Sequence, residues 1–387
     1  MEGRKNLFSS LQNHITTTGK TIWVHCSSLG EFEQGRPVIE SLRRRYPDHK
    51  IFLSFFSPSG YEIRKNYPGA DFVFYLPADS PSHARKLLDI LRPSLVIFVK
   101  YDYWFYYLRE IHTRKIPLLI VSSIFRPQQP FFKWYGGLHR KMLHFFTAVF
   151  VQDAASRDLL SEIGLTSQVI VAGDTRFDRV ISIAANSDPL PGIERFCADG
   201  KILVAGSTWP PDELILSEVM TKTEGLRIIL APHEIDPAHI QNIQKLFPSA
   251  VLFSSLGSIP DLTGTDSLII DNIGMLSSLY RYGTLTYVGG GFNAGIHNIL
   301  EAVVYQKPVM FGPRYKKFRE ANDLVSMHTA FPVETAGDLK NRIEKLLAND
   351  EGCYYKAVEN AGVYIGQNKD ATAKIMAYIE ENRLLTN

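Results

Sequence analysis

The sequence contains few of the features that mark secreted, metal-binding or membrane-spanning proteins. Its three cysteines, Cys26, Cys197 and Cys353, are far apart and odd in number, so they match neither a zinc site nor a disulfide framework. No apolar run reaches the roughly 20 residues that a membrane-spanning helix needs, and no signal peptide opens the chain. We therefore expect a globular protein of a reducing compartment.

The chain also has little net charge, +2 at pH 7, but that charge is divided unevenly. Residues 1–180 carry 24 Lys and Arg against 16 Asp and Glu, a balance of +8, and the remainder carries 18 against 24, a balance of −6. A basic half suggests an anionic partner for that half. The alternative is a chance cluster of solvated surface charges.

The length of 387 residues suits two α/β domains, since a single core rarely grows so large. Apolar strand-like runs alternate with amphipathic stretches, which is typical of parallel sheets covered by helices on both faces. The predicted strands are Thr21–Cys26, Ile51–Phe56, Phe72–Leu76, Leu95–Val99, Leu118–Ser122, Ala148–Val151, Lys201–Ala205, Leu226–Ala231, Ala250–Phe253, Leu285–Val288 and Val309–Phe311.

This alternation predicts two Rossmann-like domains. We expect the first over residues 1–183, a Pro-, Asp- and Asn-rich linker over 184–200, and the second over 201–370. Residues 371–387 contain a last helical stretch that either closes the second domain or crosses back onto the first. The expected site is a cleft where the carboxyl ends of both sheets face each other.

The first motif is WVHCSSLGE, in which a strand ends near Cys26 and a helix starts at about Glu31. A helix start at the carboxyl end of a strand offers free N–H groups. The motif lacks the G-x-G-x-x-G pattern, so a nicotinamide site is not expected. Two interpretations of Glu31 remain open: a base that points into the cleft, or a carboxylate that complements the helix dipole.

The second motif, LTYVGGGFNAGIHNILEA, places three glycines between a strand and a helix expected to begin near His297. Glycines allow a ligand to approach the backbone, and a helix start suits a phosphate. Glu301, one turn into that helix, suits the hydroxyls of a ribose. The alternative is a tight turn followed by a solvated Glu. GSTWPPDE, APHEID and DNIGMLSSLY are weaker motifs of the same half, and together they predict a nucleotide pocket.

These motifs resemble those of the 3-deoxy-D-manno-octulosonic acid (Kdo) transferases of Gram-negative bacteria, which attach Kdo to a lipid A precursor. The resemblance runs from EGRKN (residues 2–6) through WVHCSSLGE, VAGDTRFD, GST, DNIGMLSSLY and GGGFNAGIHNILEA. It implies a GT-B fold, two Rossmann-like domains facing a cleft. It also implies inverting transfer from the donor CMP-Kdo, with Glu31 as general base and Arg176 as a cation facing the donor. The residues expected at the donor are Ser207, Thr208, Pro232, His233, Gly274, Met275, Leu276, Gly290, Gly291, His297, Asn298, Ile299, Leu300 and Glu301.

The chain departs from the family pattern in places. Where many members carry E-T-E-x-W-P-N, this chain has Lys100 at one acidic position and Asp102 at the other. Asp102 is retained as a candidate catalytic residue, with its acidic role in doubt. Ile296 replaces a usual glycine, and the Arg of the N-A-R-L-S piece is missing, although Arg126 lies nearby. No Asp-x-Asp motif is present, so we expect neither a catalytic metal nor a cofactor.

The expected partners are a nucleotide-sugar donor, a phosphorylated and acylated disaccharide lipid, and an anionic membrane surface, with no nucleic acid. A segment that mixes aromatic and basic residues is typical of membrane interfaces, although a buried helix with a solvated basic face fits it too. Its candidate residues are Arg126, Phe131, Phe132, Lys133 and Trp134.

Family members usually carry an N-terminal membrane anchor before the stretch that begins here at Glu2. We expect this chain to lack the anchor, most simply by trimming, and the protein to act at the cytoplasmic face of the inner membrane. Two other functions remain open: a UDP-sugar epimerase of similar architecture, and a non-catalytic protein that binds nucleotide sugars.

Overall fold

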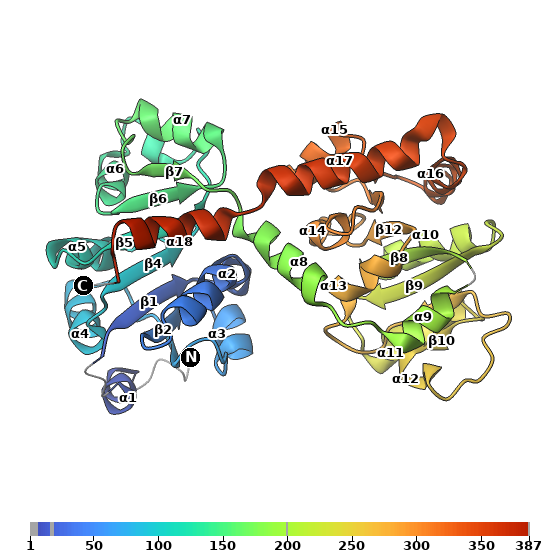
Figure 1. Cartoon of the computed structure of the whole chain (residues 1–387), viewed down its shortest axis with the longest axis horizontal. Coiled ribbons are helices and arrows are strands. Elements are labelled where there is room, and N and C mark those ends of the chain that lie inside the picture. The colour runs from blue at the N-terminus through green and yellow to red at the C-terminus, as the bar shows by residue number, and fades with distance from the viewer. Residues whose placement is uncertain (1–6, 16–18, 199, 386–387) are drawn as a thin grey trace. The chain divides into compact units, whose positions relative to one another are not determined.

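The computed structural model describes residues 7–15, 19–198 and 200–385, which divide into two compact units. Unit 1 comprises residues 1–179 and 368–387, and unit 2 comprises residues 180–367. The EGRKN stretch, residues 2–6, lies outside the described residues. Each unit is built on a parallel seven-stranded sheet (Figure 1).

The sheet of unit 1 has the strand order β3-β2-β1-β4-β5-β6-β7. From β1 the chain adds strands toward one edge of the sheet, and from β4 it adds them toward the other edge. The pair β1 and β4 is therefore the topological switch point. The strands are β1 (Thr21–Cys26), β2 (Lys50–Phe55), β3 (Phe72–Tyr75), β4 (Leu95–Val99), β5 (Leu118–Ser123), β6 (Ala148–Val151) and β7 (Val169–Val171).

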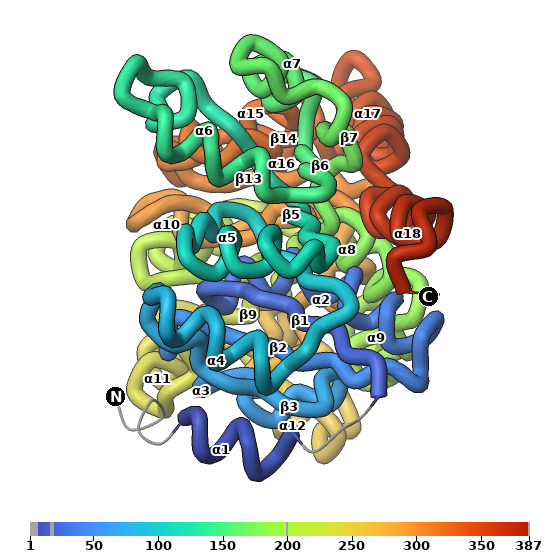
Figure 2. The backbone as a smooth tube through the Cα atoms, turned by 90° about the vertical axis from the view of Figure 1, so that its left-hand side faces the viewer, coloured from blue at the N-terminus to red at the C-terminus, as the bar shows by residue number. Residues whose placement is uncertain are grey.

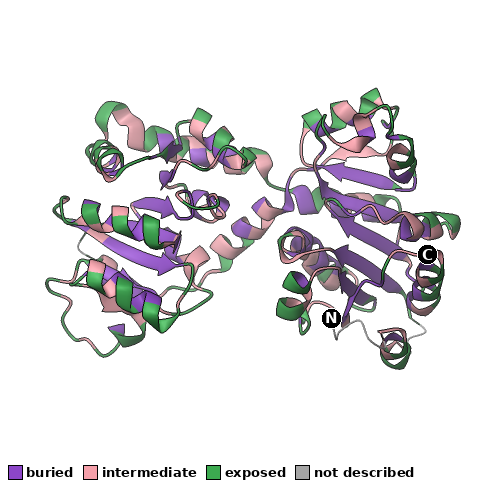
Figure 3. Ribbon diagram, turned by 180° about the vertical axis from the view of Figure 1, so that it is seen from behind, coloured by how far each residue is buried: buried purple, intermediate pink, exposed green. Residues whose placement is uncertain are grey.

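The two faces of this sheet carry different cores because side chains alternate along each strand. Trp23 and Phe98 enter one core, while Val24 and Ile97 enter the other. The central strands β1, β4 and β5 are therefore buried throughout, whereas the edge strand β7 is only half-buried. Exposed residues lie on the outer sides of the helices (Figure 3). The helices of unit 1 are α1 (Leu7–His14), α2 (Leu29–Arg45), α3 (Pro58–Arg64), α4 (Pro81–Leu91), α5 (Phe105–Thr113), η2 (Pro130–Phe132), α6 (Gly137–Leu143) and α7 (Ala154–Glu162).

Unit 1 is completed by segments from both ends of the chain. Helix α1 lies beside β3 (Figure 2). His14 of this helix stacks on Phe72, with ring centroids 5.0 Å apart. Helix α18 (Ala371–Glu381) buries Ile375, Met376 and Ile379 in the core that also contains α2 (Figure 1). The last helical stretch of the chain thus packs on the first unit.

The sheet of unit 2 has the order β10-β11-β9-β8-β12-β13-β14, with its switch point between β8 and β12. Its strands are β8 (Lys201–Thr208), β9 (Leu226–Pro232), β10 (Val251–Leu252), β11 (Ser267–Ile269), β12 (Leu285–Val288), β13 (Val309–Phe311) and β14 (Ala330–Pro332). Its helices are α9 (Pro191–Cys197), α10 (Pro210–Met220), α11 (Pro237–Leu246), α12 (Phe253–Leu256), α13 (Leu276–Leu279), η3 (Tyr280–Tyr282), α14 (Leu300–Val303), α15 (Arg319–Ser326), α16 (Ala336–Ala348), η4 (Asp350–Gly352) and α17 (Cys353–Asn368).

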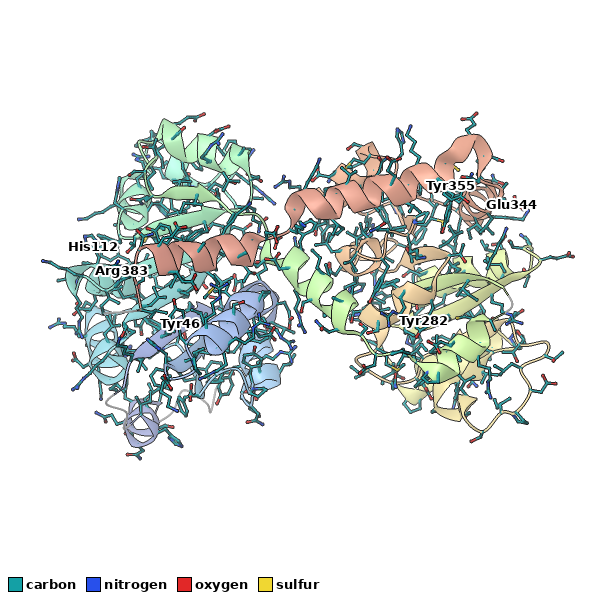
Figure 4. All side chains as sticks on the ribbon, in the orientation of Figure 1. Tyr46, His112, Tyr282, Glu344, Tyr355 and Arg383 are labelled. Carbon is teal, nitrogen blue, oxygen red and sulfur yellow. The ribbon has the colours of Figure 1, made fainter. Side chains whose placement is uncertain are left out.

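The stretch 184–200, read above as a linker, contains helical structure. Helix α8 (Thr175–Asn186) continues into it, and α9 follows with Ile193 and Phe196 buried. The N–H of Leu190 donates to the hydroxyl of Tyr282 at 2.8 Å, which ties the start of α9 to η3 (Figure 4). The end of this stretch is therefore part of unit 2.

Candidate active site

Glu31 lies at the switch point of unit 1, directly after β1. Helix α2 begins at Leu29, and Ser28 is its N-cap. The Glu31 carboxylate accepts the Ser28 N–H at 2.8 Å and the Ser28 hydroxyl at 3.1 Å, while the Glu31 N–H donates to Ser28 Oγ at 3.4 Å. This reciprocal pair is a capping box. Glu31 therefore has the helix-start role, and its side chain remains only half-buried at the carboxyl end of the strand.

Asp102 occupies the matching position after β4, the other strand of the switch point. Its carboxylate accepts the N–H of Ser27 at 3.2 Å and also the Ser27 hydroxyl. His25 Nε2 lies 3.4 Å from the same carboxylate. Two consecutive serines therefore hold two carboxylates, Ser27 holding Asp102 and Ser28 holding Glu31.

Burial dominates the electrostatics of this cluster. Burial raises the pKa of Asp102 to about 6 and lowers the pKa of His25 to about 3, so this histidine is neutral. Burial, followed by repulsion from Asp102, also raises the pKa of Glu31. A carboxylate with a raised pKa is a stronger base than an ordinary glutamate.

Lys100, which replaces a family carboxylate, ends β4 in a left-handed conformation with φ of 68°. Its ammonium lies 5.2 Å from the ring centroid of Tyr101. A non-glycine residue in this region costs free energy and often marks a functional strand end. The acidic side chain that follows β4 is that of Asp102, two residues after Lys100.

Arg176 belongs to unit 1, where it lies in the first turn of α8. Its guanidinium contacts Asp174, with Nε and a terminal nitrogen each 2.8 Å from the carboxylate. Asp174 in turn accepts the side-chain amide of Gln34 on α2 at 3.4 Å. The arginine is thus anchored to the first unit, and its expected role toward the donor stays a prediction.

In unit 2, the glycines after β12 approach other backbone segments closely. Gly290 has φ of 89°, and a Cβ on Gly291 would lie 2.6 Å from the backbone of Gly312. The buried Asp212 accepts the N–H of Gly290 at 2.9 Å and the Tyr287 hydroxyl at 2.7 Å. Asp212 therefore fixes this loop to the start of α10.

The expected helix start behind this loop is wrong. The N–H of His297 bonds to the Gly289 carbonyl at 3.1 Å, so the chain is still in a loop there. Helix α14 begins only at Leu300 and has four residues, with Ile299 before it. Glu301 is consequently in its first turn, where it accepts the side-chain amide of Asn298 at 2.9 Å. A four-residue helix adds little dipole for a phosphate.

A stack of three rings crosses the carboxyl ends of β8, β9 and β12. Trp209 and His233 have ring centroids 4.7 Å apart, and His233 and His297 are 4.3 Å apart, both pairs at 27°. The Trp209 indole N–H donates to His297 Nε2 at 2.9 Å. The motifs predicted both histidines as donor-site residues, whereas no motif predicted a role for Trp209 or Asp212.

Other expected donor residues lie at the ends of strands of the same sheet or in the loops of unit 2. Thr208 donates to Glu213 at 3.0 Å, and Ser207 has φ of 52°. Pro232 ends β9 next to His233. The DNIGMLSSLY motif contributes Gly274 with φ of 100°, Met275 and Leu276 at the start of α13. These residues all lie in unit 2 and follow strands of one sheet.

Among the residues of unit 1 expected at a membrane, Phe131 was predicted wrongly. Phe131 is 3% exposed and packs against Tyr103 and Phe125, at centroid distances of 4.8 and 5.6 Å. Phe132 is half-buried. By contrast, Trp134 is 92% exposed, and Tyr135 and Leu138 are exposed beside it. Phe131 is therefore a core residue, and the exposed aromatic part begins at Trp134, directly after Lys133.

Among the described residues, one group of His, Asp and Glu has its ligand atoms within 4.8 Å of one another: Glu234, Asp236 and His239. Both ring nitrogens of His239 are occupied, Nδ1 by the Glu234 carbonyl and Nε2 by Glu213, each at 2.9 Å. This histidine has no lone pair directed at an ion. The expectation of a metal-independent site stays a prediction.

Comparison with known proteins agrees with the motifs. Residues 4–179 match the family model for 3-deoxy-D-manno-octulosonic-acid transferase (kdotransferase). The 3-deoxy-D-manno-octulosonic acid transferase of Rickettsia felis is 26% identical over 90% of this chain and 76% of that protein, and its namesake from Aquifex aeolicus is 27% identical over 84% and 86%. The chain is thus similar to Kdo transferases over most of its length, and its first half matches their family model. This similarity supports a transferase of the glycosyltransferase type.

Solved structures identify the fold. UDP-GlcNAc 2-epimerase from Neisseria meningitidis, bound to UDP-GlcNAc, superposes with a TM-score of 0.62 at 18% identity, covering 94% of this chain and 100% of that one. This likeness supports the GT-B class of two Rossmann-like domains. Within the described part of this chain, no helix is long and apolar enough to cross a membrane.

Proposed function

We propose that this chain is a Kdo transferase that moves Kdo from CMP-Kdo to a lipid A precursor, with inversion at the anomeric carbon. The proposed acceptor is thus a phosphorylated and acylated disaccharide lipid. The observation that carries the proposal is Glu31, a half-buried carboxylate of raised pKa at the carboxyl end of β1. Capping holds its side chain in one place, which a general base requires.

In the proposed reaction, the Glu31 carboxylate takes the proton of the acceptor hydroxyl as its oxygen bonds to the anomeric carbon. The bond from that carbon to the phosphate oxygen breaks, and CMP leaves with the electron pair. The leaving phosphate needs charge stabilisation and no proton donor. Backbone N–H groups of the glycine loop and Arg176 are the candidates, so no metal enters the scheme.

On the donor side, the loops of unit 2 offer a ribose and phosphate site. Backbone at Gly290 and Gly291 is close-packed, Glu301 has a carboxylate for ribose hydroxyls, and the His233–His297 pair lies beside them. On the acceptor side we revise the apolar contact residues to Trp134, Tyr135 and Leu138. These are the exposed apolar residues of the segment and suit a membrane interface.

The test is sugar transfer from CMP-Kdo, made in situ, to a tetra-acylated lipid A precursor, with product detected by mass. Glu31→Gln should lose at least about a hundredfold in turnover, yet keep its fold, because glutamine also completes a capping box. Glu33→Gln is the matched control: Glu33 lies on the same helix and pairs with Arg64 at 2.8 Å. Equal turnover in Glu31→Gln and Glu33→Gln would reject Glu31 as the base.

Nucleotide preference separates the proposal from a UDP-sugar epimerase. The melting temperature should rise more with CMP than with UDP at equal concentration, because the ligand of higher affinity stabilises the folded state more. A larger effect of UDP would favour the epimerase.

A further inference from the structure

Trp209 contacts His297 in the loop after β12, and it has no role in the proposed reaction. It is the N-cap of α10, followed by Pro210 and Pro211, and its N–H donates to Asp212 at 3.0 Å. The prolines restrict the backbone here. The indole is therefore held on a fixed backbone, with its N–H 2.9 Å from His297 Nε2.

This hydrogen bond determines which nitrogen of His297 carries the proton. An indole N–H is a donor only, so Nε2 must present its lone pair, and the proton of the neutral ring lies on Nδ1. The Gly289 carbonyl fixes the backbone of His297, and His233 covers one face of its ring. The ring therefore has little freedom to turn away from the indole.

We infer that Trp209 is a positioning residue that holds His297 as the neutral Nδ1–H tautomer, so that this loop presents an uncharged N–H donor to the nucleotide. The ligand class, a nucleoside monophosphate group, rests on the proposed function. The tautomer does not, because it follows from contacts within the protein. The ring of His297 therefore adds no pH dependence of its own to phosphate binding over the range in which free histidine titrates.

The titratable groups around His297 do not oppose this state. His233 stacks on the ring, Asp212 lies on α10, Glu301 on α14, and Lys317 donates to the Ala294 carbonyl of the same loop. Burial, followed by the charge of His233, lowers the pKa of His297 to about 4. The indole bond adds to this, because protonation of Nε2 would break it.

The first experiment records long-range ¹H–¹⁵N correlation spectra of the whole chain with ¹⁵N-labelled histidine and without ligand. A His297→Gln variant identifies the signals. The wild type should show Nδ1 protonated and Nε2 unprotonated at pH 7. Trp209→Phe keeps an aromatic ring and removes the N–H, so the Nε2–H tautomer should appear and the pKa of His297 should rise. Trp134→Phe, in unit 1, is the matched control and should leave the His297 signals unchanged.

The second experiment measures CMP binding by calorimetry from pH 5.5 to 8. Wild-type affinity should follow only the ionisation of the CMP phosphate itself, whose second pKa is about 6. Trp209→Phe should bind CMP about fivefold more tightly at the acidic end, because a protonated imidazole makes a stronger hydrogen bond to phosphate. An Nε2–H or charged His297 in the wild type, or an unchanged spectrum in Trp209→Phe, overturns the inference even when CMP binds. The expected tautomer without CMP binding instead rejects the proposed donor, and with it the ligand part of the inference.

Discussion

At the scale of single residues, the site of unit 1 depends on how two neighbouring carboxylates affect each other. Asp102 is buried and Glu31 half-buried, and the charge of Asp102 raises the pKa of Glu31. A base acts only when ionised, so activity is lost as the pH falls through the pKa of Glu31. The acid limb of the profile of kcat/KM should therefore lie above the ordinary glutamate value of 4.5.

Asp102→Asn removes the charge that repels the ionised form of Glu31. The pKa of Glu31 should fall, and the acid limb should move to lower pH. The measurement is kcat/KM for Kdo transfer from pH 4.5 to 8. Asp79→Asn is the control: Asp79 is a half-buried carboxylate of the same unit that accepts the N–H groups of Tyr106 and Tyr107. An acid limb that moves equally in Asp102→Asn and Asp79→Asn, or in neither variant, would contradict the electrostatic coupling of Asp102 to Glu31.

The residues that sequence reasoning found and missed differ in how far away their partners lie. Glu31 contacts Ser28, three positions away, and serine followed by glutamate at this spacing is a local signal of a helix start. Trp209 contacts His297, 88 positions away, and Asp212 contacts Gly290, 78 positions away. No pattern within a window of sequence contains such pairs, because the fold alone brings β8 and β12 together.

At the scale of elements, most strands were predictable, including the three-residue β13 (Val309–Phe311), and three other short strands were not. Thr21–Cys26, Leu95–Val99 and Leu285–Val288 agree with the structure at both ends. The strands β7, β11 and β14 have three residues each, too few to show a period, and were missed. The helix expected from His297 onward is limited to the four residues of α14. The N–H of His297 bonds to the Gly289 carbonyl of the glycine loop, so the chain is not helical there.

The segment around η2 and α6 shows that composition does not tell a core aromatic from a surface aromatic. Phe131→Ala should lower the free energy of unfolding by about 3–5 kcal/mol, since it empties a packed site. Trp134→Ser should change it by less than about 0.5 kcal/mol and weaken binding to lipid vesicles. Thermal unfolding and cosedimentation with anionic vesicles measure the two effects. Strong destabilisation by Trp134→Ser, with unchanged vesicle binding, would remove this residue from the proposed membrane contact.

At the scale of the whole molecule, the uneven charge coincides with the structural division. Residues 368–387, which join unit 1, carry three basic and three acidic side chains, so the +8 balance of residues 1–180 also describes unit 1. The −6 balance falls on unit 2. A chain with opposite charge on its two units should bind an anionic surface through unit 1.

Salt separates this electrostatic attraction from the apolar contact. Binding of the whole chain to vesicles with anionic lipid should weaken steeply as salt rises from about 50 to 500 mM, since the Debye length falls over this range to a few ångströms. Trp134→Ser should bind more weakly at every salt concentration with the same salt dependence, because it removes apolar area and no charge. Cosedimentation with anionic and with zwitterionic vesicles measures how binding depends on salt concentration for each vesicle type. Salt-independent binding, equal on the two vesicle types, would mean that the charge of unit 1 plays no part in docking and that its anionic partner is the phosphorylated acceptor alone.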